Sequence, residues 1–192
     1  KILKKDTRLK GIINNNIGYA DGVGAVMALK QKGLDAIKIP GSEFWLDIVN
    51  RFYKLKSFYI VGSSQKVIDR TIEKLKDDFP AINIVGYRNG YLKDGEKEQL
   101  KSDIVEKKPD IVFVAQGTPA QEYLMNDLMD VHKALYMGLG GSFDVYTGYK
   151  KRAPKFYLDF HLEWFYRLLK EPTRISRQYI LVKFLILLKM RM

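Results

Sequence analysis

The sequence predicts an α/β protein of the Rossmann-like type, with a mostly parallel sheet flanked by helices and a basic helical appendage at the carboxyl end. Short apolar runs of strand length alternate with segments of helical spacing, an order that is typical of βαβ units and parallel strands. The apolar runs are nearly continuous, as in strands that are covered on both faces. A chain of 192 residues, 46% of them hydrophobic, can form one such domain and an appendage.

The predicted elements alternate along the chain. Four strands are predicted, at Ser57–Gly62, Ile82–Tyr87, Asp110–Ala115 and Lys133–Leu139. The spacing of apolar residues predicts helices at Gly22–Gln31, Ser42–Leu55, Ser64–Phe79, Asp94–Lys107, Pro119–Asp130 and His161–Lys170. Pro172 ends the last of these helices, because the residue before a proline is pushed out of helical geometry.

A further helical pattern covers Thr173–Met192, where Lys183 and Lys189 interrupt the apolar run. A membrane-spanning helix needs about 20 mainly apolar residues, so the apolar run, which begins at Tyr179, is too short and too charged to span. Two interpretations remain open. The helix lies in the membrane interface, or it packs against its own domain or a sister subunit.

Positive charge is concentrated at the carboxyl end. The chain has 33 Lys and Arg against 22 Asp and Glu, a net charge of +11. Residues 150–192 hold eleven basic and three acidic residues and contribute +8 of it. We therefore divide the chain into a core, residues 1–149, and a basic amphipathic appendage, residues 150–192. Such an end favours a polyanion as partner: membrane lipid, a pyrophosphate or nucleic acid.

Several classes of chemistry are disfavoured by what the sequence lacks. There is no Cys, which excludes disulfides, thiolate nucleophiles and Cys-type zinc sites, and only two His, His132 and His161. The phosphate loop of ATPases and the Gly-x-Ser-x-Gly turn of serine hydrolases are also missing. So is the Asp-x-Asp metal site of many sugar-nucleotide transferases. A reducing, cytoplasmic compartment fits this composition.

The first motif that could carry chemistry is the segment Tyr19–Val26, in which Asp21 and Gly22 open a predicted helix. Glycine lets a ligand approach the backbone closely, and a helix N-terminus favours an anion. Asp21 is a candidate general base, and capping the helix is its alternative role. The glycine spacing does not complete a dinucleotide fingerprint, because Met27 stands where the third glycine would be.

The second motif, Ala115–Glu122, follows the third predicted strand and opens a helix. Open α/β sheets place their ligands at the carboxyl ends of such strands. Gly117 and Thr118 could offer a backbone and a hydroxyl donor to a phosphate. Gln121 and Glu122 are polar where a plain connection needs neither. The alternative is a strand–helix turn with ordinary capping.

The third motif, Gly138–Asp144, follows the fourth predicted strand and is rich in glycine, including Gly140 and Gly141. A backbone that passes close to a sugar or a nucleotide would explain these glycines, and so would a tight turn. Asp144 could bind a sugar hydroxyl or cap the following turn.

Four stretches together resemble the WecG/TagA/CpsF family of bacterial glycosyltransferases, glycosyltransferase family 26. They are Asp21–Gly24, Gly117–Glu122, Gly138–Asp144, and Lys151–Pro154 followed by Leu162–Arg174. The resemblance implies an inverting transferase that is independent of metal and needs no cofactor. Its substrates would be a UDP-sugar donor and an undecaprenyl-pyrophosphate-linked sugar acceptor, and it would transfer an N-acetylmannosamine-type sugar or a related hexose or uronic acid. The product would enter teichoic acid or another bacterial surface polysaccharide.

The resemblance also implies where the protein works. Members are Rossmann-like, with a basic appendage that meets the membrane and closes the active site. The expected place is therefore the cytoplasm, peripheral on the inner face of the cell membrane, with the anionic membrane surface as partner. A homo-oligomer is a further possible assembly, and no nucleic acid is expected.

Residue roles follow from the match of motifs. Asp21 matches the family aspartate that is proposed as general base, and Gln121 matches a pocket glutamine. Arg167, Arg174 and Arg177 match the appendage arginines, whose guanidinium groups suit phosphate oxygens. The other candidate substrate-binding residues are Gly22, Lys38, Gly117, Thr118, Glu122, Gly140, Gly141 and Asp144.

Some positions depart from the family pattern. Ala20 stands where members usually have proline, and Lys38 where they often have arginine. Members carry roughly 40 more residues upstream, a length comparable to a βαβ unit, with a Thr and an Asn of the pocket. The chain is thus expected to be a fragment or a degenerate member. Two other functions stay open: a non-catalytic, membrane-associated relative, and a basic nucleic-acid-binding α/β protein.

Overall fold

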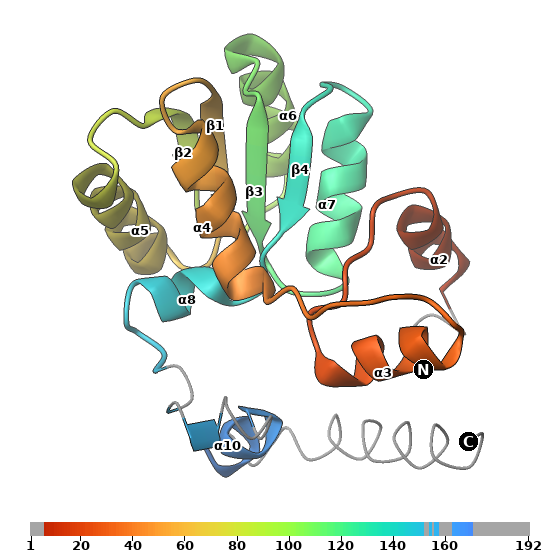
Figure 1. The fold of residues 1–192 in the computed structure, drawn as a ribbon. Coiled ribbons are helices and arrows are strands. Elements are labelled where there is room, and N and C mark those ends of the chain that lie inside the picture. The colour runs from red at the N-terminus through yellow and green to blue at the C-terminus, as the bar shows by residue number, and fades with distance from the viewer. Residues whose placement is uncertain (1–5, 152–153, 155, 158–162, 171–192) are drawn as a thin grey trace. The chain divides into compact units, whose positions relative to one another are not determined.

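The computed structural model of the chain describes residues 6–151, 154, 156–157 and 163–170 (Figure 1). The chain divides into two compact units, one of residues 1–18 and 41–150 and the other of residues 19–40 and 151–192. The expected boundary near residue 150 falls where the chain passes from the first unit to the second. Residues 19–40 also belong to the second unit, a grouping that composition and charge do not indicate.

The first unit is built on a sheet of four parallel strands in the order β2-β1-β3-β4. The strands are β1 (Ser57–Gly62), β2 (Asn83–Arg88), β3 (Ile111–Ala115) and β4 (Leu135–Gly138). This confirms the α/β, Rossmann-like class and all four predicted strands. β2 lies one residue later than predicted, and β4 is shorter at both ends.

Helices cover both faces of this sheet (Figure 1). One face carries α4 (Gly41–Phe52), α5 (Gln65–Asp78) and α8 (Ser142–Tyr146), and the other carries α6 (Glu96–Lys107) and α7 (Ala120–Met129). Side chains of β1 alternate between the two cores: Phe58 and Ile60 face the first, and Tyr59 and Val61 the second. Nearly every residue of β1 and β3 is buried, which explains why their sequences are almost continuously apolar.

Trp45 of α4 fixes the position of α8. Its fully buried ring makes edge-to-face contacts with Phe113 of β3 and with Phe143 and Tyr146 of α8, at centroid distances of 5.6, 5.6 and 5.2 Å. Such pairs add about 0.5–1.5 kcal/mol each beyond the area they bury. The sequence analysis missed α8, because five residues are too few to show helical periodicity.

The structure also has a helix where the sequence analysis expected only an apolar approach to Asp21: α2 (Thr7–Asn14). Its N-cap is Asp6, whose carboxylate accepts a hydrogen bond from the Leu9 backbone N–H at 2.9 Å. Tyr123 of α7 donates its hydroxyl to the same carboxylate. The sequence contains the signal for the start of this helix, an Asp ahead of the apolar residues Leu9, Ile12 and Ile13.

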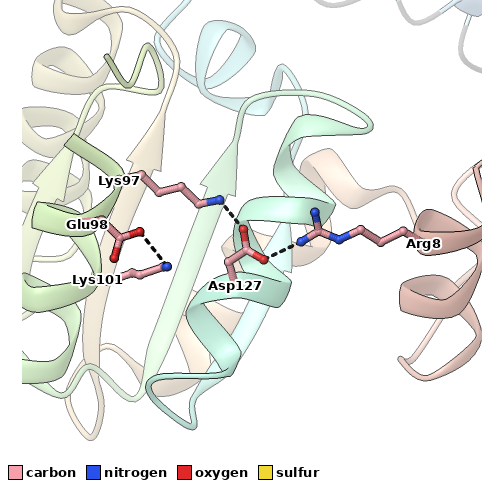
Figure 2. A network of polar contacts seen from close by, with 5 residues as sticks. All are labelled: Arg8, Lys97, Glu98, Lys101 and Asp127. Carbon is pink, nitrogen blue, oxygen red and sulfur yellow. Dashed lines mark hydrogen bonds and ion pairs between the residues drawn. The ribbon is translucent and has the colours of Figure 1, made fainter. Parts of the chain in front are cut away.

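Asp127 of α7 connects three helices (Figure 2). Its carboxylate pairs with Arg8 of α2 at 2.6 Å and with Lys97 of α6. Burial alone would raise the pKa of Asp127, but the hydrogen bond from Lys97 and the positive charges of Lys97, Arg8 and Lys101 outweigh it and hold the pKa below its usual value. The network fastens α7 on both sides, and α7 begins with the residues of the second motif.

The second unit is described in two parts. Its first part contains α3 (Val23–Gln31), and the backbone N–H of Ile39 donates to the carbonyl of Ala20 at 2.9 Å, which joins the two ends of this part. Its second part contains α10 (Glu163–Lys170), where the rings of Tyr157 and Tyr166 lie 5.2 Å apart. Both helices were predicted within two residues of their observed bounds. The predicted helix Thr173–Met192 lies outside the described residues.

A carboxylate at the amino edge of the sheet yields a test of the fold. Asp110 accepts from the Ser57 backbone N–H, the Lys56 ammonium and the Ser57 hydroxyl, each at 2.9 Å, and these bonds lower its pKa to about 2. Because the pKa of Asp110 is lower in the folded state than in the unfolded chain, its ionised carboxylate stabilises the fold. This stabilisation is complete above about pH 4 and is lost as the pH falls through 2.

We therefore expect Asp110→Asn to lower the free energy of unfolding at pH 6, and the difference from the wild type to shrink between pH 4 and pH 2. Urea titrations at several pH values measure it, with Asp77→Asn, at an exposed position of α5, as the control for the loss of one negative charge. A difference between wild type and Asp110→Asn that does not change with pH would contradict this account.

Candidate functional site

The carboxyl edge of the sheet has the topology of a ligand site. β1 and β3 are neighbours, and the chain leaves them in opposite directions, from β1 through α5 to β2 and from β3 through α7 to β4. Open α/β sheets bind ligands at this reversal of strand order. Two of the sequence motifs, 115–122 and 138–144, lie in the loops of this edge.

Glycines allow the loops after β1 and β2 to meet. Gly62 has φ +145°, and a Cβ there would lie 2.4 Å from the carbonyl oxygen of Ala115. A Cβ on Gly90 would lie 2.9 Å from the Cα of Gly62. The loops are joined by hydrogen bonds from the backbone N–H of Ser63 to Ala115, from that of Gly90 to Ser63, and from the Gln116 side chain to Gly90.

Gln121 joins the loops after β3 and β4. Its side-chain oxygen accepts from the backbone N–H groups of Gly117 at 3.2 Å and Gly140 at 2.9 Å, and its amide nitrogen donates to Glu122 at 3.0 Å. The residue is 7% exposed. A Cβ on Gly138 would lie 2.6 Å from the same amide nitrogen, so only glycine leaves room for it. We call this set of contacts the Gln121 bridge.

Glu122 collects hydrogen bonds on one of its oxygens. Its Oε1 accepts from the Thr118 hydroxyl at 2.9 Å and from the Gln121 amide at 3.0 Å. The backbone N–H of Gly117 and the hydroxyl of Thr118, which the sequence suggested as donors to a phosphate, therefore donate within the loop. These bonds form because Gln121 and Glu122 supply acceptors one helical turn away from Gly117 and Thr118.

Asp144 brings the third motif to the loop after β1. Its carboxylate accepts from the Ser63 hydroxyl at 3.2 Å, and Asp144 itself lies in the first turn of α8. Ser63 has φ +55°, a conformation that is uncommon for a residue with a side chain. The bond from the Gly140 N–H to Gln121 places the Gly117–Glu122 and Gly138–Asp144 loops side by side.

Three further polar residues at this edge were missed by the sequence analysis: Ser63, Asn89 and Gln116. Asn89 donates its side-chain amide to Gln65 at 2.9 Å, at the start of α5. Ser63 and Gln116 directly follow predicted strands, so the strand-end rule also indicates these two residues. Asn89 lies two residues beyond the predicted strand Ile82–Tyr87 and directly follows the observed β2.

Comparison with known proteins decides the family. A model of the glycosyl transferase WecG/TagA/CpsF family matches residues 2–192. The chain belongs to this family. The N-acetylglucosaminyldiphosphoundecaprenol N-acetyl-beta-D-mannosaminyltransferase of Bacillus spizizenii is 41% identical over 167 residues, which are 85% of this chain and 64% of that relative. The chain therefore spans slightly less than two thirds of the length of the relative.

The remaining candidate residues of this family member lie in the second unit. Asp21 and Lys38 flank the backbone hydrogen bond between Ala20 and Ile39. The N-cap position of α3 is Gly22, so the alternative of Asp21 as the N-cap residue is not what the structure shows. Arg167 lies on α10, and Arg174 and Arg177 lie outside the described residues.

Two kinds of feature are absent from the part of the chain that the structure describes. None of the helices there is long and apolar enough to cross a membrane. In the same part of the chain, no group of three or more His, Asp or Glu residues is placed to hold a metal ion.

The Gln121 bridge predicts a stability effect. Gln121→Ala would leave the partly buried N–H groups of Gly117 and Gly140 without their acceptor, and leaving a polar group unsatisfied costs up to about 1–3 kcal/mol. We expect a loss of this size in urea denaturation. Gln99→Ala, at an exposed position of α6, should stay within about 0.5 kcal/mol of the wild type. Equal losses in the two variants would show that the bridge does not hold the loops.

Proposed function

We propose that this chain carries an inverting glycosyltransferase activity. It transfers an N-acetylmannosamine-type sugar, or a related hexose or uronic acid, from a UDP-sugar to an undecaprenyl-pyrophosphate-linked sugar. The observation that carries the proposal is the family match over nearly the whole chain. The name of the Bacillus spizizenii relative, which describes N-acetylmannosaminyl transfer to a lipid-diphosphate-linked N-acetylglucosamine, supports this substrate class. The product enters teichoic acid or another bacterial surface polysaccharide.

The proposed chemistry needs a base and a group that accepts negative charge. Asp21 removes the proton of the acceptor hydroxyl as this oxygen attacks the anomeric carbon, and UDP departs from the opposite face. Arg167, Arg174 and Arg177 offset the charge that develops on the leaving pyrophosphate, and Lys38 adds a further cation. In this mechanism no metal ion is needed, because the arginines take the place of the cation that Asp-x-Asp transferases use.

The loops of the carboxyl edge bind substrate in this proposal. Glu122 contributes from the loop after β3, whose shape Gly117, Thr118 and Gln121 maintain, and Gly140, Gly141 and Asp144 contribute from the loop after β4. Gly22 allows close approach beside Asp21. The support is topological, since the first two sets of residues converge where α/β sheets place ligands. A nucleic-acid-binding function gains no support from the family or from the relative.

The proposed place of work is the cytoplasmic face of the membrane. The appendage, residues 150–192, would hold the protein on anionic lipid through its +8 charge and its apolar residues. Each basic residue near such a surface contributes about 1 kcal/mol. Docking on the membrane brings the arginines to the pyrophosphate of the lipid-linked acceptor. A homo-oligomer is a separate assembly that the proposal includes.

The role of Asp21 can be tested directly. A positioned general base contributes about 10²–10⁴-fold to the rate, so Asp21→Asn should lose turnover by this factor while it still binds UDP-sugar. The assay follows UDP release from UDP-N-acetylmannosamine with a lipid-linked N-acetylglucosamine acceptor, and calorimetry measures binding. Asp35→Asn, an exposed aspartate of the same unit, is the matched control. Turnover near that of the wild type in Asp21→Asn would remove Asp21 from the mechanism.

The role of the appendage is tested by deleting residues 173–192. We expect a folded protein that no longer sediments with anionic vesicles and has little transferase activity. The double variant Lys10→Gln and Lys32→Gln removes two positive charges elsewhere and should still bind the vesicles. An unfolded product would assign the segment to the core, and vesicle binding that survives the deletion would exclude it as the anchor.

A further inference from the structure

The side-chain oxygen of Gln121 cannot accept a further hydrogen bond from a ligand. That oxygen already accepts from two backbone N–H groups, those of Gly117 and Gly140, and an amide oxygen has two lone pairs. Its nitrogen donates to Glu122 and occupies the space that a Cβ on Gly138 would need. Gln121 is thus a positioning residue, which holds two loops and one carboxylate in place.

Glu122 differs from Gln121 in having an unused acceptor. Two donors, the Thr118 hydroxyl and the Gln121 amide, both reach Oε1. The second oxygen, Oε2, is buried from solvent and has no hydrogen-bond partner among the residues that the structure describes. The two hydrogen bonds to Oε1 therefore fix the orientation of the carboxyl group, while Oε2 has no hydrogen-bond donor among the described residues.

An unsatisfied buried acceptor is unfavourable, and the cost is larger for a charged group than for a neutral one. Native proteins contain few buried polar atoms that lack a hydrogen-bond partner, and each one needs a physical explanation. A donor that arrives with a ligand would supply the missing bond when the ligand displaces the neighbours that shield Oε2 from solvent. The donor cannot be a phosphate, because phosphate and carboxylate oxygens both accept and carry like charge. Hydroxyl and amide N–H groups of a sugar are neutral donors of the required kind.

We propose that Glu122 Oε2 accepts a hydrogen bond from a hydroxyl or amide N–H group of the transferred or the accepting sugar, and that Gln121 positions it for this contact. The inference rests on the proposed glycosyltransferase function and assigns the substrate chemistry of one end of its site. The loop after β3 thus binds the sugar, and the phosphates lie elsewhere.

The test compares wild type, Glu122→Gln and the control Glu73→Gln, an exposed glutamate of α5. Calorimetry measures the Kd of UDP and of UDP-N-acetylmannosamine, and the UDP-release assay gives the KM for the lipid-linked acceptor. Glu122→Gln replaces the acceptor Oε2 by a donor, and a hydrogen bond to a charged group corresponds to about 10- to 150-fold in affinity. We expect a loss of this size for one sugar-bearing substrate and an unchanged Kd for UDP.

The constant that changes, the Kd of UDP-N-acetylmannosamine or the KM for the acceptor, shows which of the two sugars Glu122 contacts. A contact with the transferred sugar weakens UDP-N-acetylmannosamine, whereas a contact with the accepting sugar raises the KM for the lipid-linked acceptor. Unchanged constants for both substrates in a folded variant would overturn the inference, as would an equal loss for UDP and UDP-N-acetylmannosamine. A wild type that neither binds UDP-sugar nor releases UDP would instead overturn the proposed function, and the inference with it.

Thermal unfolding separates binding from a structural role. Glu122→Gln keeps an oxygen for Thr118, so we expect its melting temperature to stay close to that of the wild type. If Glu122→Gln does not fold, Glu122→Asp tests the inference instead. This variant keeps the negative charge, and its side chain is shorter by one methylene group, which withdraws the carboxylate from the sugar. The same selective loss of a sugar-bearing substrate is expected there, and unaltered affinity would overturn the inference.

Discussion

The backbone N–H groups of Gly117 and Gly140 belong to different loops, and one side-chain oxygen accepts from both. The geometry of the carboxyl edge depends on this shared acceptor. A buried N–H group without a partner is costly, so the loops after β3 and β4 can lie side by side only while Gln121 occupies the space between them. Gly138 has to be glycine for the same reason, because any Cβ would fill that space.

The rest of the first unit holds this arrangement from two sides. On one face of the sheet, the ring of Trp45 fixes α8 and with it the end of the loop that contains Gly140. On the other, Asp127 connects α7 to α2 and α6, so the helix that carries Gln121 in its first turn cannot shift freely. Rigid elements thus support loops that need a defined shape, as a binding site requires.

The charges of the two loops suit a neutral ligand group. Glu122 and Asp144 contribute carboxylates, and the donors near them, Thr118 and Ser63, already bond to these carboxylates. The cations proposed to meet phosphate are Lys38 and the appendage arginines, which belong to the other unit.

The α/β class, the four parallel strands and the family all follow from the sequence alone. Periodicity and strand-end motifs are local, so they are readable without coordinates. The sequence did not reveal α8 or the roles within the Gly117–Glu122 loop, where the donors expected to face a phosphate bond to Gln121 and Glu122 instead. Only the tertiary structure decides which of several polar neighbours a donor reaches, because that choice depends on distances between loops that are far apart in the chain.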